Sequence, residues 1–112
     1  MSTTYLSVDY FPLTVNFFDR DAIELAEAKY GIRVDGAVCK LLCKIFKEGY
    51  YIPWGEEQSL IFARKLGGEL SGKEMDGIIQ ILLDKGFFVK ESYEKFQILT
   101  SVKIQRIWID ST

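Results

Sequence analysis

The 112-residue sequence contains no histidine, and this absence excludes several kinds of chemistry. Histidine-based acid–base catalysis, Ser–His and Cys–His nucleophile pairs and histidine-ligated metal sites all need the missing imidazole. The sequence also lacks a glycine-rich phosphate-binding loop and any recognisable pair of catalytic carboxylates. We therefore expect a protein that is not an enzyme, with no catalytic residue, no cofactor, no metal and no small-molecule substrate.

Cysteine is scarce. The two cysteines, Cys39 and Cys43, are four positions apart, so they share one face if the segment is helical. A zinc site would need about two further ligands, and none is spaced to supply them. A disulfide is not expected in the reducing cytosol. The pair is typical of small apolar side chains buried in a core.

Long apolar runs and a surplus of positive charge are missing as well. No apolar segment approaches the roughly 18 residues of a membrane-spanning helix, and the first residues lack a basic region followed by an apolar one. We expect a cytoplasmic protein without membrane contact. The net charge of −2 gives no overall basic character, so any nucleic-acid binding must come from a local patch of lysine and arginine.

Two apolar stripes at helical spacing are the clearest features that the sequence does contain. The first stripe ends before Gly49, and the second follows a capping box of Ser71 and Glu74 and ends at Gly86. Each stripe predicts one amphipathic helix. The members are Val38, Leu41, Leu42, Ile45 and Phe46 in the first stripe and Met75, Ile78, Ile79, Leu82 and Leu83 in the second.

Two shorter helices and a row of lysines complete the helical part. One helix is expected to begin at a cap of Asp19 or Asp21 and to end at Gly31, and another to run from about Glu56 to Leu66. Three lysines line a separate side of the helix that carries the first stripe. They indicate either a solvated face or phosphate contacts, and the sequence leaves both open. These lysines are Lys40, Lys44 and Lys47.

The string YYIPW, residues 50–54, stands between two helices and has strand propensity. Pro53 lacks the N–H that a central strand needs, so a short edge strand over about 50–53 is expected. Its partner is expected in a wing hairpin over about 87–99, with strands at Phe87–Lys90 and Phe96–Leu99 joined by a polar turn.

In chain order, these elements predict a mainly α (α+β) fold. The expected architecture is a winged helix-turn-helix with an extra N-terminal helix, in which the strand at 50–53 and the wing hairpin form a small sheet. We expect a single winged-helix domain over 1–112, with an extended lead at 1–18. The tail at 100–112 fits either the start of a helix or a strand.

A winged helix commonly places the second helix of its helix-turn-helix unit in the major groove of DNA. Here that helix is Lys73–Lys85, whose outward residues sum to a charge of 2 − 3 = −1, a poor surface for phosphates. The N-terminal end of this helix, near Arg64 and Lys65, is better suited to binding phosphate. Scattered solubilising charges are the alternative interpretation. The candidate DNA-contacting residues are Arg64, Lys65, Lys73, Gln80, Lys90, Lys95, Lys103 and Arg106.

Three segments carry a resemblance to a known group of proteins: YFPLTVNFFDRDAIELAEAKYGI, KLLCKIFKEGYYIPW and KGFFVKESYEKFQILTSVKIQ. They resemble the N-terminal domain of phage- and mobile-element-associated bacterial proteins, which are similar to replisome organisers and distantly similar to DnaD-type primosome proteins. The resemblance spans Tyr10 to about Gln105 and includes no catalytic motif. It implies a fold and a replication context, but no active site.

Two functions are therefore expected. The first is a non-enzymatic DNA-binding module of a phage- or mobile-element-type replication initiation or primosome protein. The second is a module that binds replication proteins or itself, without DNA contact. The resemblance favours the second as well, because the winged-helix part of DnaD-type proteins serves oligomerisation. Aromatic residues that look exposed also favour it, and these are Tyr5, Tyr10, Phe11, Phe17 and Trp108.

Overall fold

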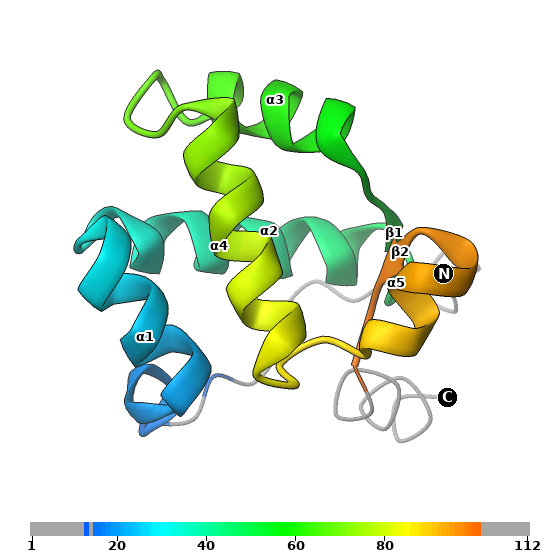
Figure 1. The fold of residues 1–112 in the computed structure, drawn as a ribbon, viewed down its shortest axis with the longest axis horizontal. Coiled ribbons are helices and arrows are strands. Elements are labelled where there is room, and N and C mark those ends of the chain that lie inside the picture. The colour runs from blue at the N-terminus through cyan, green and yellow to red at the C-terminus, as the bar shows by residue number, and fades with distance from the viewer. Residues whose placement is uncertain (1–12, 14, 102–112) are drawn as a thin grey trace, which may run out of the picture.

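The computed structural model of the chain describes residues 13 and 15–101, and these residues form a mainly helical structure with a small antiparallel sheet. Helix α2 crosses behind α4, α3 lies across the N-terminal end of α4, α1 lies beside the other half of α4, and α5 lies beside the two strands (Figure 1). The elements are the 3₁₀ helix η2 (Phe17–Asp19), α1 (Asp21–Tyr30), α2 (Arg33–Lys47), β1 (Ile52–Pro53), α3 (Glu56–Lys65), α4 (Gly72–Asp84), α5 (Lys90–Phe96) and β2 (Ile98–Leu99).

The two predicted stripes form the centre of the core. All ten of their residues are buried, five on α2 and five on α4. The spacing of the stripe places these side chains on one face of each helix, and the free energy gained by burying them holds the two faces against the rest of the chain. Both helices are therefore confirmed, and each ends two residues before the glycine predicted to terminate it.

Helices α3 and α4 make the most extensive contact between elements among the described residues. Gly72, the first residue of α4, lies against the middle of α3, and a Cβ added to it would be 3.1 Å from the Cα of Leu60. The predicted capping box is present: Ser71 Oγ accepts from the Glu74 amide at 3.0 Å, and Glu74 accepts from the Ser71 amide at 2.9 Å. The turn between α3 and α4 thus ends in a well-defined helix start.

The strand predicted at YYIPW is present, but it is shorter than expected. Ile52 pairs with Leu99, and Pro53 pairs with Ile98, in a two-stranded antiparallel sheet. Pro53 is tolerated because both strands of such a sheet are edges. The Thr100 hydroxyl donates to the Tyr50 carbonyl at 2.9 Å, so this short ladder fastens two parts of the chain that are fifty positions apart.

The expected wing hairpin is wrong in its first strand and in its turn. Helix α5 occupies the segment predicted as a polar turn. Of the first strand, one ladder-like bond remains among the described residues, from the Val89 amide to the Thr100 carbonyl at 2.8 Å. The segment contains no glycine, proline, aspartate or asparagine to make a turn, and Glu91 and Lys95 form an i, i+4 ion pair at 3.3 Å. Helix formation therefore wins over the hairpin.

The start of the first helix and the exposure of Phe17 differ from the predictions. The first helix ends at Gly31 as predicted, but its N-cap is Arg20 instead of Asp19 or Asp21, and no side chain caps it. Phe17, expected to be exposed, is buried against Phe18 and Phe87, with ring centroids 5.0 and 5.9 Å away. The predictions for 1–12, for the tail beyond Ser101, and for Tyr5, Tyr10, Phe11 and Trp108 lie outside the described residues.

Candidate nucleic-acid interface

The corner where α3 turns into α4 brings together three of the predicted site residues. Arg64 and Lys65 are exposed in the last turn of α3, and Lys73 is exposed in the first turn of α4. None of the three takes part in an ion pair among residues 15–101. Each can therefore offer its full charge to an anion.

A fourth cation, Arg33, stands beside this corner and was not identified from the sequence. Its guanidinium donates to the carbonyl of Glu69 and lies 3.9 Å from the carboxylate of Glu74. The hydrogen bond from the Ser71 amide, followed by the charge of Arg33, lowers the pKa of Glu74. Arg33 thus fixes the turn from the start of α2. No spacing rule links positions so far apart in the sequence.

The charge of the corner is positive on balance. Arg33, Arg64, Lys65 and Lys73 contribute +4, and the carboxylates of Glu69 and Glu74 contribute −2, which leaves +2. The Glu74 amide is already used by the capping box. Anion binding here therefore depends mainly on the side chains and only partly on free amides at the start of α4.

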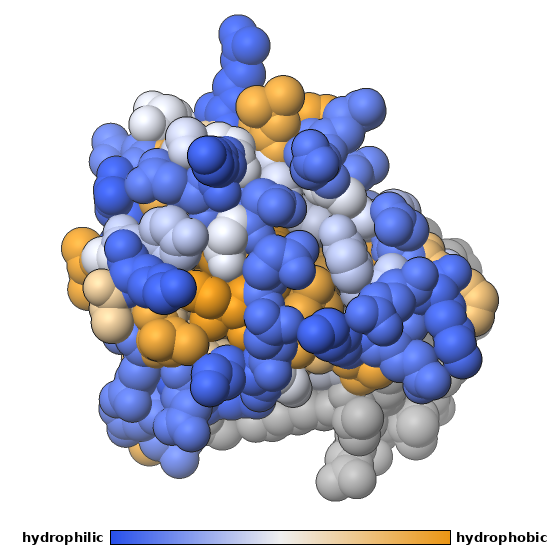
Figure 2. Space-filling model, in the orientation of Figure 1, coloured by the Kyte–Doolittle hydropathy of each residue, from blue (hydrophilic) through white to orange (hydrophobic). Residues whose placement is uncertain are grey.

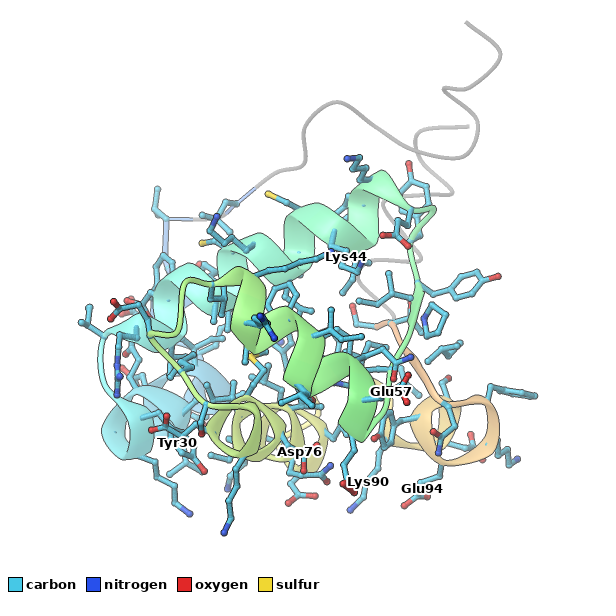
Figure 3. All side chains as sticks on the ribbon, turned by 90° about the horizontal axis from the view of Figure 1, so that it is seen from above. Tyr30, Lys44, Glu57, Asp76, Lys90 and Glu94 are labelled. Atoms are coloured by element: carbon cyan, nitrogen blue, oxygen red, sulfur yellow. The ribbon has the colours of Figure 1, made fainter. Side chains whose placement is uncertain are left out.

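The remaining described candidates lie along an acidic edge. Gln80 is exposed on α4, and Asp76, Lys90 and Glu94 line one edge of the molecule in Figure 3. Lys90 pairs with Asp84 at 3.0 Å, and Lys95 pairs with Glu91 at 3.3 Å. The predicted residues Lys103 and Arg106 lie outside the described part of the chain. Arg64, Lys65 and Lys73 thus lie on the two helical turns that flank the α3–α4 connection, whereas Lys90 and Lys95 lie on α5 and are paired with carboxylates.

The pKa of Tyr93 is affected by the negative charge of this edge. Burial raises the pKa of its hydroxyl first, and the nearby carboxylates of Asp76 and Glu56 raise it further. Tyr93 belongs to α5, which takes the place of the predicted wing. Where the sequence predicted a wing against a phosphate backbone, the structure instead has a helix among carboxylates.

A groove lies between α2 and α3, on the other side of α3 from Asp76 (Figure 3). Its volume is about 250 Å³, and its lining combines apolar side chains with two lysines. The spacing of the α3 residues, i, i+3, i+4 and i+7, could have indicated a shared face, but the sequence does not say that it faces the lysine row of α2. The lining residues are Lys44, Trp54, Gln58, Ile61, Phe62 and Lys65.

Two carboxyl groups meet between α1 and α2. A hydrogen bond with Asp35, followed by desolvation and the charges of Asp35, Glu24 and Asp19, raises the pKa of Glu27 to about 7. One oxygen of Asp35, Oδ1, is buried and has no donor among the described residues when both carboxyl groups are ionised. A protonated Glu27 can supply the missing donor.

The cysteine prediction is correct in part. Both thiols are free, but Cys43 is exposed and Cys39 is only half-buried, so the expected burial of both is wrong. Burial and the neighbouring Cys43 raise the pKa of Cys39. Lys40 and Cys43 are exposed, because they lie on the side of α2 opposite to its buried apolar stripe.

Within 13 and 15–101, no group of three or more histidine, cysteine, aspartate or glutamate side chains could hold a metal ion. No helix in the same part of the chain is long and apolar enough to cross a membrane.

Comparison with known proteins gives a family. Residues 10–104 match the family described as "Lin1244/Lin1753-like, N-terminal". The chain is 28% identical over 98 residues to the "Uncharacterized phage-related protein Lin1244/Lin1753" of Listeria innocua serovar 6a (strain ATCC BAA-680 / CLIP 11262), and the match covers 88% of this chain and 32% of that protein. No solved structure matches the chain. The phage association of the resemblance is confirmed, whereas these matches give no support for a winged-helix or DnaD-type relationship. The chain belongs to the Lin1244/Lin1753-like N-terminal domain family.

Proposed function

We propose that this domain is a non-enzymatic DNA-binding module of a phage-type replication initiation protein. The observation that carries the proposal is the α3–α4 corner, where Arg64, Lys65 and Lys73 are exposed without a carboxylate partner among the described residues. Neutralised phosphates supply most of the free energy of non-specific DNA binding. Three such cations around one turn offer contacts to neighbouring phosphates.

The charge distribution favours one orientation on DNA. Asp76, Asp84 and Glu94 on α4 and α5 would repel a phosphate backbone, whereas the corner would attract it. The α3–α4 pair would thus approach with its turn foremost, and the middle of α4 would stay out of the groove. In this arrangement the contacts go to phosphates, so binding would depend little on base sequence.

The replication context has a separate basis. The relative from Listeria innocua is described as phage-related, and this chain covers 32% of its length. A phage-associated role is consistent with that description, while the assignment to replication initiation rests on the sequence resemblance alone. The cytoplasmic location and the absence of catalysis belong to the same proposal.

A module for binding replication proteins or for self-association is the second candidate function. Leu60 and Ile61 of α3 are 61% and 49% exposed, and Phe96 of α5 is 70% exposed. An apolar area interrupts the hydrophilic surface over α3 in Figure 2. Exposed apolar side chains next to each other are typical of a contact with another protein.

Salt titrations of binding to duplex and to single-stranded DNA would test the first proposal. We expect affinity that falls steeply with salt, and Arg64→Ala or Lys73→Ala should each lower the salt slope by about 1. Lys95→Ala is the matched control, because Lys95 already pairs with Glu91, and it should leave the slope unchanged. No binding at about 50 mM salt, together with a concentration-dependent dimer in light scattering, would reject the proposal in favour of self-association.

A further inference from the structure

We propose that the groove between α2 and α3 binds a short peptide segment of a partner protein, in which apolar side chains alternate with carboxylates. This goes beyond the DNA contact proposed above and uses a neighbouring surface, which shares Lys65 with the α3–α4 corner. Three features support it: a rigid apolar floor, lysines on both walls, and a size that suits one or two side chains.

The floor of the groove is held in place by its own contacts. The indole N–H of Trp54 donates to the Ser59 hydroxyl at 2.9 Å, in a buried hydrogen bond between the end of β1 and α3. The ring of Phe62 stands edge-on to Trp54, with centroids 5.6 Å apart. Because both rings are fixed in the free protein, little conformational entropy remains to be lost when a ligand binds.

The apolar part of the groove continues to the surface. Ile61 lines the groove and is 49% exposed, so an apolar ligand side chain could cover it and bury more area. The volume of about 250 Å³ is below the roughly 300–1,000 Å³ of pockets for drug-sized molecules. It suits an anchoring side chain of a peptide better than a whole cofactor.

The walls supply positive charge. Lys44 comes from α2 and Lys65 from α3, so a ligand in the groove passes between two ammonium groups. Lys40 and Lys47 extend the positive row along α2. Lys44 pairs with Glu48 at 2.6 Å at the surface, and a ligand carboxylate can replace that partner at small cost because exposed pairs contribute little.

A nucleic acid fits this groove less well than such a peptide. Single strands bind by stacking bases on open aromatic faces, but Trp54 is only 2% exposed and Phe62 only 8%. A ligand can contact the apolar edge of the groove floor, but neither the Trp54 ring nor the Phe62 ring has a face free for stacking. Carboxylates beside an aliphatic or aromatic anchor match both the charge and the shape.

The test uses the tryptophan of the groove as its probe. Trp54 and Trp108 are the two tryptophans of the chain, so Trp108→Phe leaves Trp54 as the single tryptophan, which can be excited apart from the tyrosines. The ligand is a short capped peptide in which leucine and phenylalanine alternate with aspartate, and the comparison peptide has lysine at every aspartate. We expect a saturable change in Trp54 emission with the acidic peptide, and binding at least about tenfold weaker with the basic one.

Substitutions at the groove locate the binding. Ile61→Asp should weaken the acidic peptide about tenfold or more, since it removes apolar area and repels the carboxylates. Ile32→Asp is the matched control: Ile32 is also apolar, is 78% exposed and lies outside the groove lining, so its change should leave binding intact. Lys44→Gln combined with Lys65→Gln should reduce the preference for the acidic over the basic peptide. Circular dichroism spectra of all variants verify that they are folded.

Several outcomes would overturn the proposal. Equal affinity for both peptides would show that charge plays no part, and equal loss in Ile61→Asp and Ile32→Asp would place the binding elsewhere. Trp54 emission that responds to a single-stranded oligonucleotide but not to the acidic peptide would assign the groove to nucleic acid. A self-association that Ile61→Asp abolishes, without peptide binding, would assign it to a second copy. The DNA proposal is tested separately by Arg64→Ala and Lys73→Ala, because neither residue lines this groove.

Discussion

Gly72 and Gly36 both lie within helices, but only Gly72 is needed for close packing. A Cβ at Gly72 would lie 3.1 Å from the Cα and 2.8 Å from the Cδ1 of Leu60, whereas a Cβ at Gly36 would meet no atom of the described residues within 4 Å. The Leu60 side chain could rotate away, but its backbone could not. At Gly72 a side chain therefore forces α3 and α4 apart, and at Gly36 it has free space.

Alanine at these two positions should change stability in opposite directions. Gly72→Ala should lower the free energy of unfolding by about 1–2 kcal/mol through overpacking. Gly36→Ala should raise it by about 0.5–1 kcal/mol, because alanine is the better helix former. Urea denaturation of both variants measures the difference. A stabilised Gly72→Ala variant would show that the two helices can separate without loss.

The carboxyl pair of Glu27 and Asp35 makes stability depend on pH. The pKa of Glu27 rises to about 7 in the folded state, from an ordinary value of 4.5. Between these two values the folded chain holds a proton that the unfolded chain has released, so the pair's contribution is fully present below pH 4.5 and is lost as the pH rises through 7. Glu74, whose pKa is lowered, has the opposite dependence, so the effect of the pair must be isolated by substitution.

The substitution Glu27→Gln isolates the effect of the Glu27–Asp35 pair on stability, because the glutamine amide remains a donor to Asp35 at every pH. We expect this variant and the wild type to be similarly stable near pH 4.5 and the variant to be more stable near pH 8. Because Glu27 is partly exposed to solvent, we expect a difference of about 1 kcal/mol or less. Thermal unfolding of both proteins across this range is the measurement, and a difference that does not change with pH would contradict the shared proton.

At the scale of the elements, α4 is the helix whose start is best determined. The reciprocal bonds of Ser71 and Glu74 satisfy two amides, at distances of 3.0 and 2.9 Å. Ser71→Ala should cost about 1 kcal/mol in unfolding free energy. Ser92→Ala in α5, where the N-cap makes no side-chain bond, is the control and should be neutral or slightly stabilising. Chemical denaturation distinguishes them, and equal effects would mean that the capping box contributes nothing.

Sequence patterns predicted some of the helices correctly and failed for one of them. The stripes on α2 and α4 predict their helices because 3.6-residue periodicity is a local property that burial then reinforces. The segment Phe87–Leu99 is different, since it is short and has no apolar period. Its state depends on Tyr93 finding a half-buried place against the core and on Lys90 reaching Asp84 of α4. Such contacts between distant parts of the chain override local propensity.

At the scale of the whole molecule, one buried hydrogen bond joins the middle of the chain to its later part. The Thr100 hydroxyl donates to the Tyr50 carbonyl at 2.9 Å, beside the short β1–β2 ladder. Tyr50 adopts a φ of 81°, which is unusual for a residue other than glycine. Burial of its ring, edge-on to Phe46 at 5.6 Å, offsets the strain of that conformation.

Loss of this hydroxyl should therefore destabilise the whole fold. Thr100→Val keeps the shape but removes the donor, and it should lower the unfolding free energy by about 1–2 kcal/mol. Thr100→Ser keeps the donor and loses one methyl group, so it should retain the hydrogen bond and cost less. Thermal melts that place the valine variant at or above the serine variant would contradict this account.

The sequence by itself determined the local features: the helices of the two apolar stripes, the capping box of α4, the short strand at Pro53 and the modest overall charge. These depend on residue spacing and backbone chemistry, which act over a few positions. The tertiary structure decided that Ile98–Leu99, and not the first strand of the expected hairpin, pairs with β1, and its contacts add to the local preference of the segment after Lys90 for a helix. It also decided which cations are free. Arg64, Lys65 and Lys73, on either side of the α3–α4 connection, have no ion-pair partner among the described residues, while Lys90 and Lys95 are paired with carboxylates of α4 and α5. The physical reason is that electrostatic and packing energies depend on distances in space, and a linear sequence does not give the distances between its distant residues.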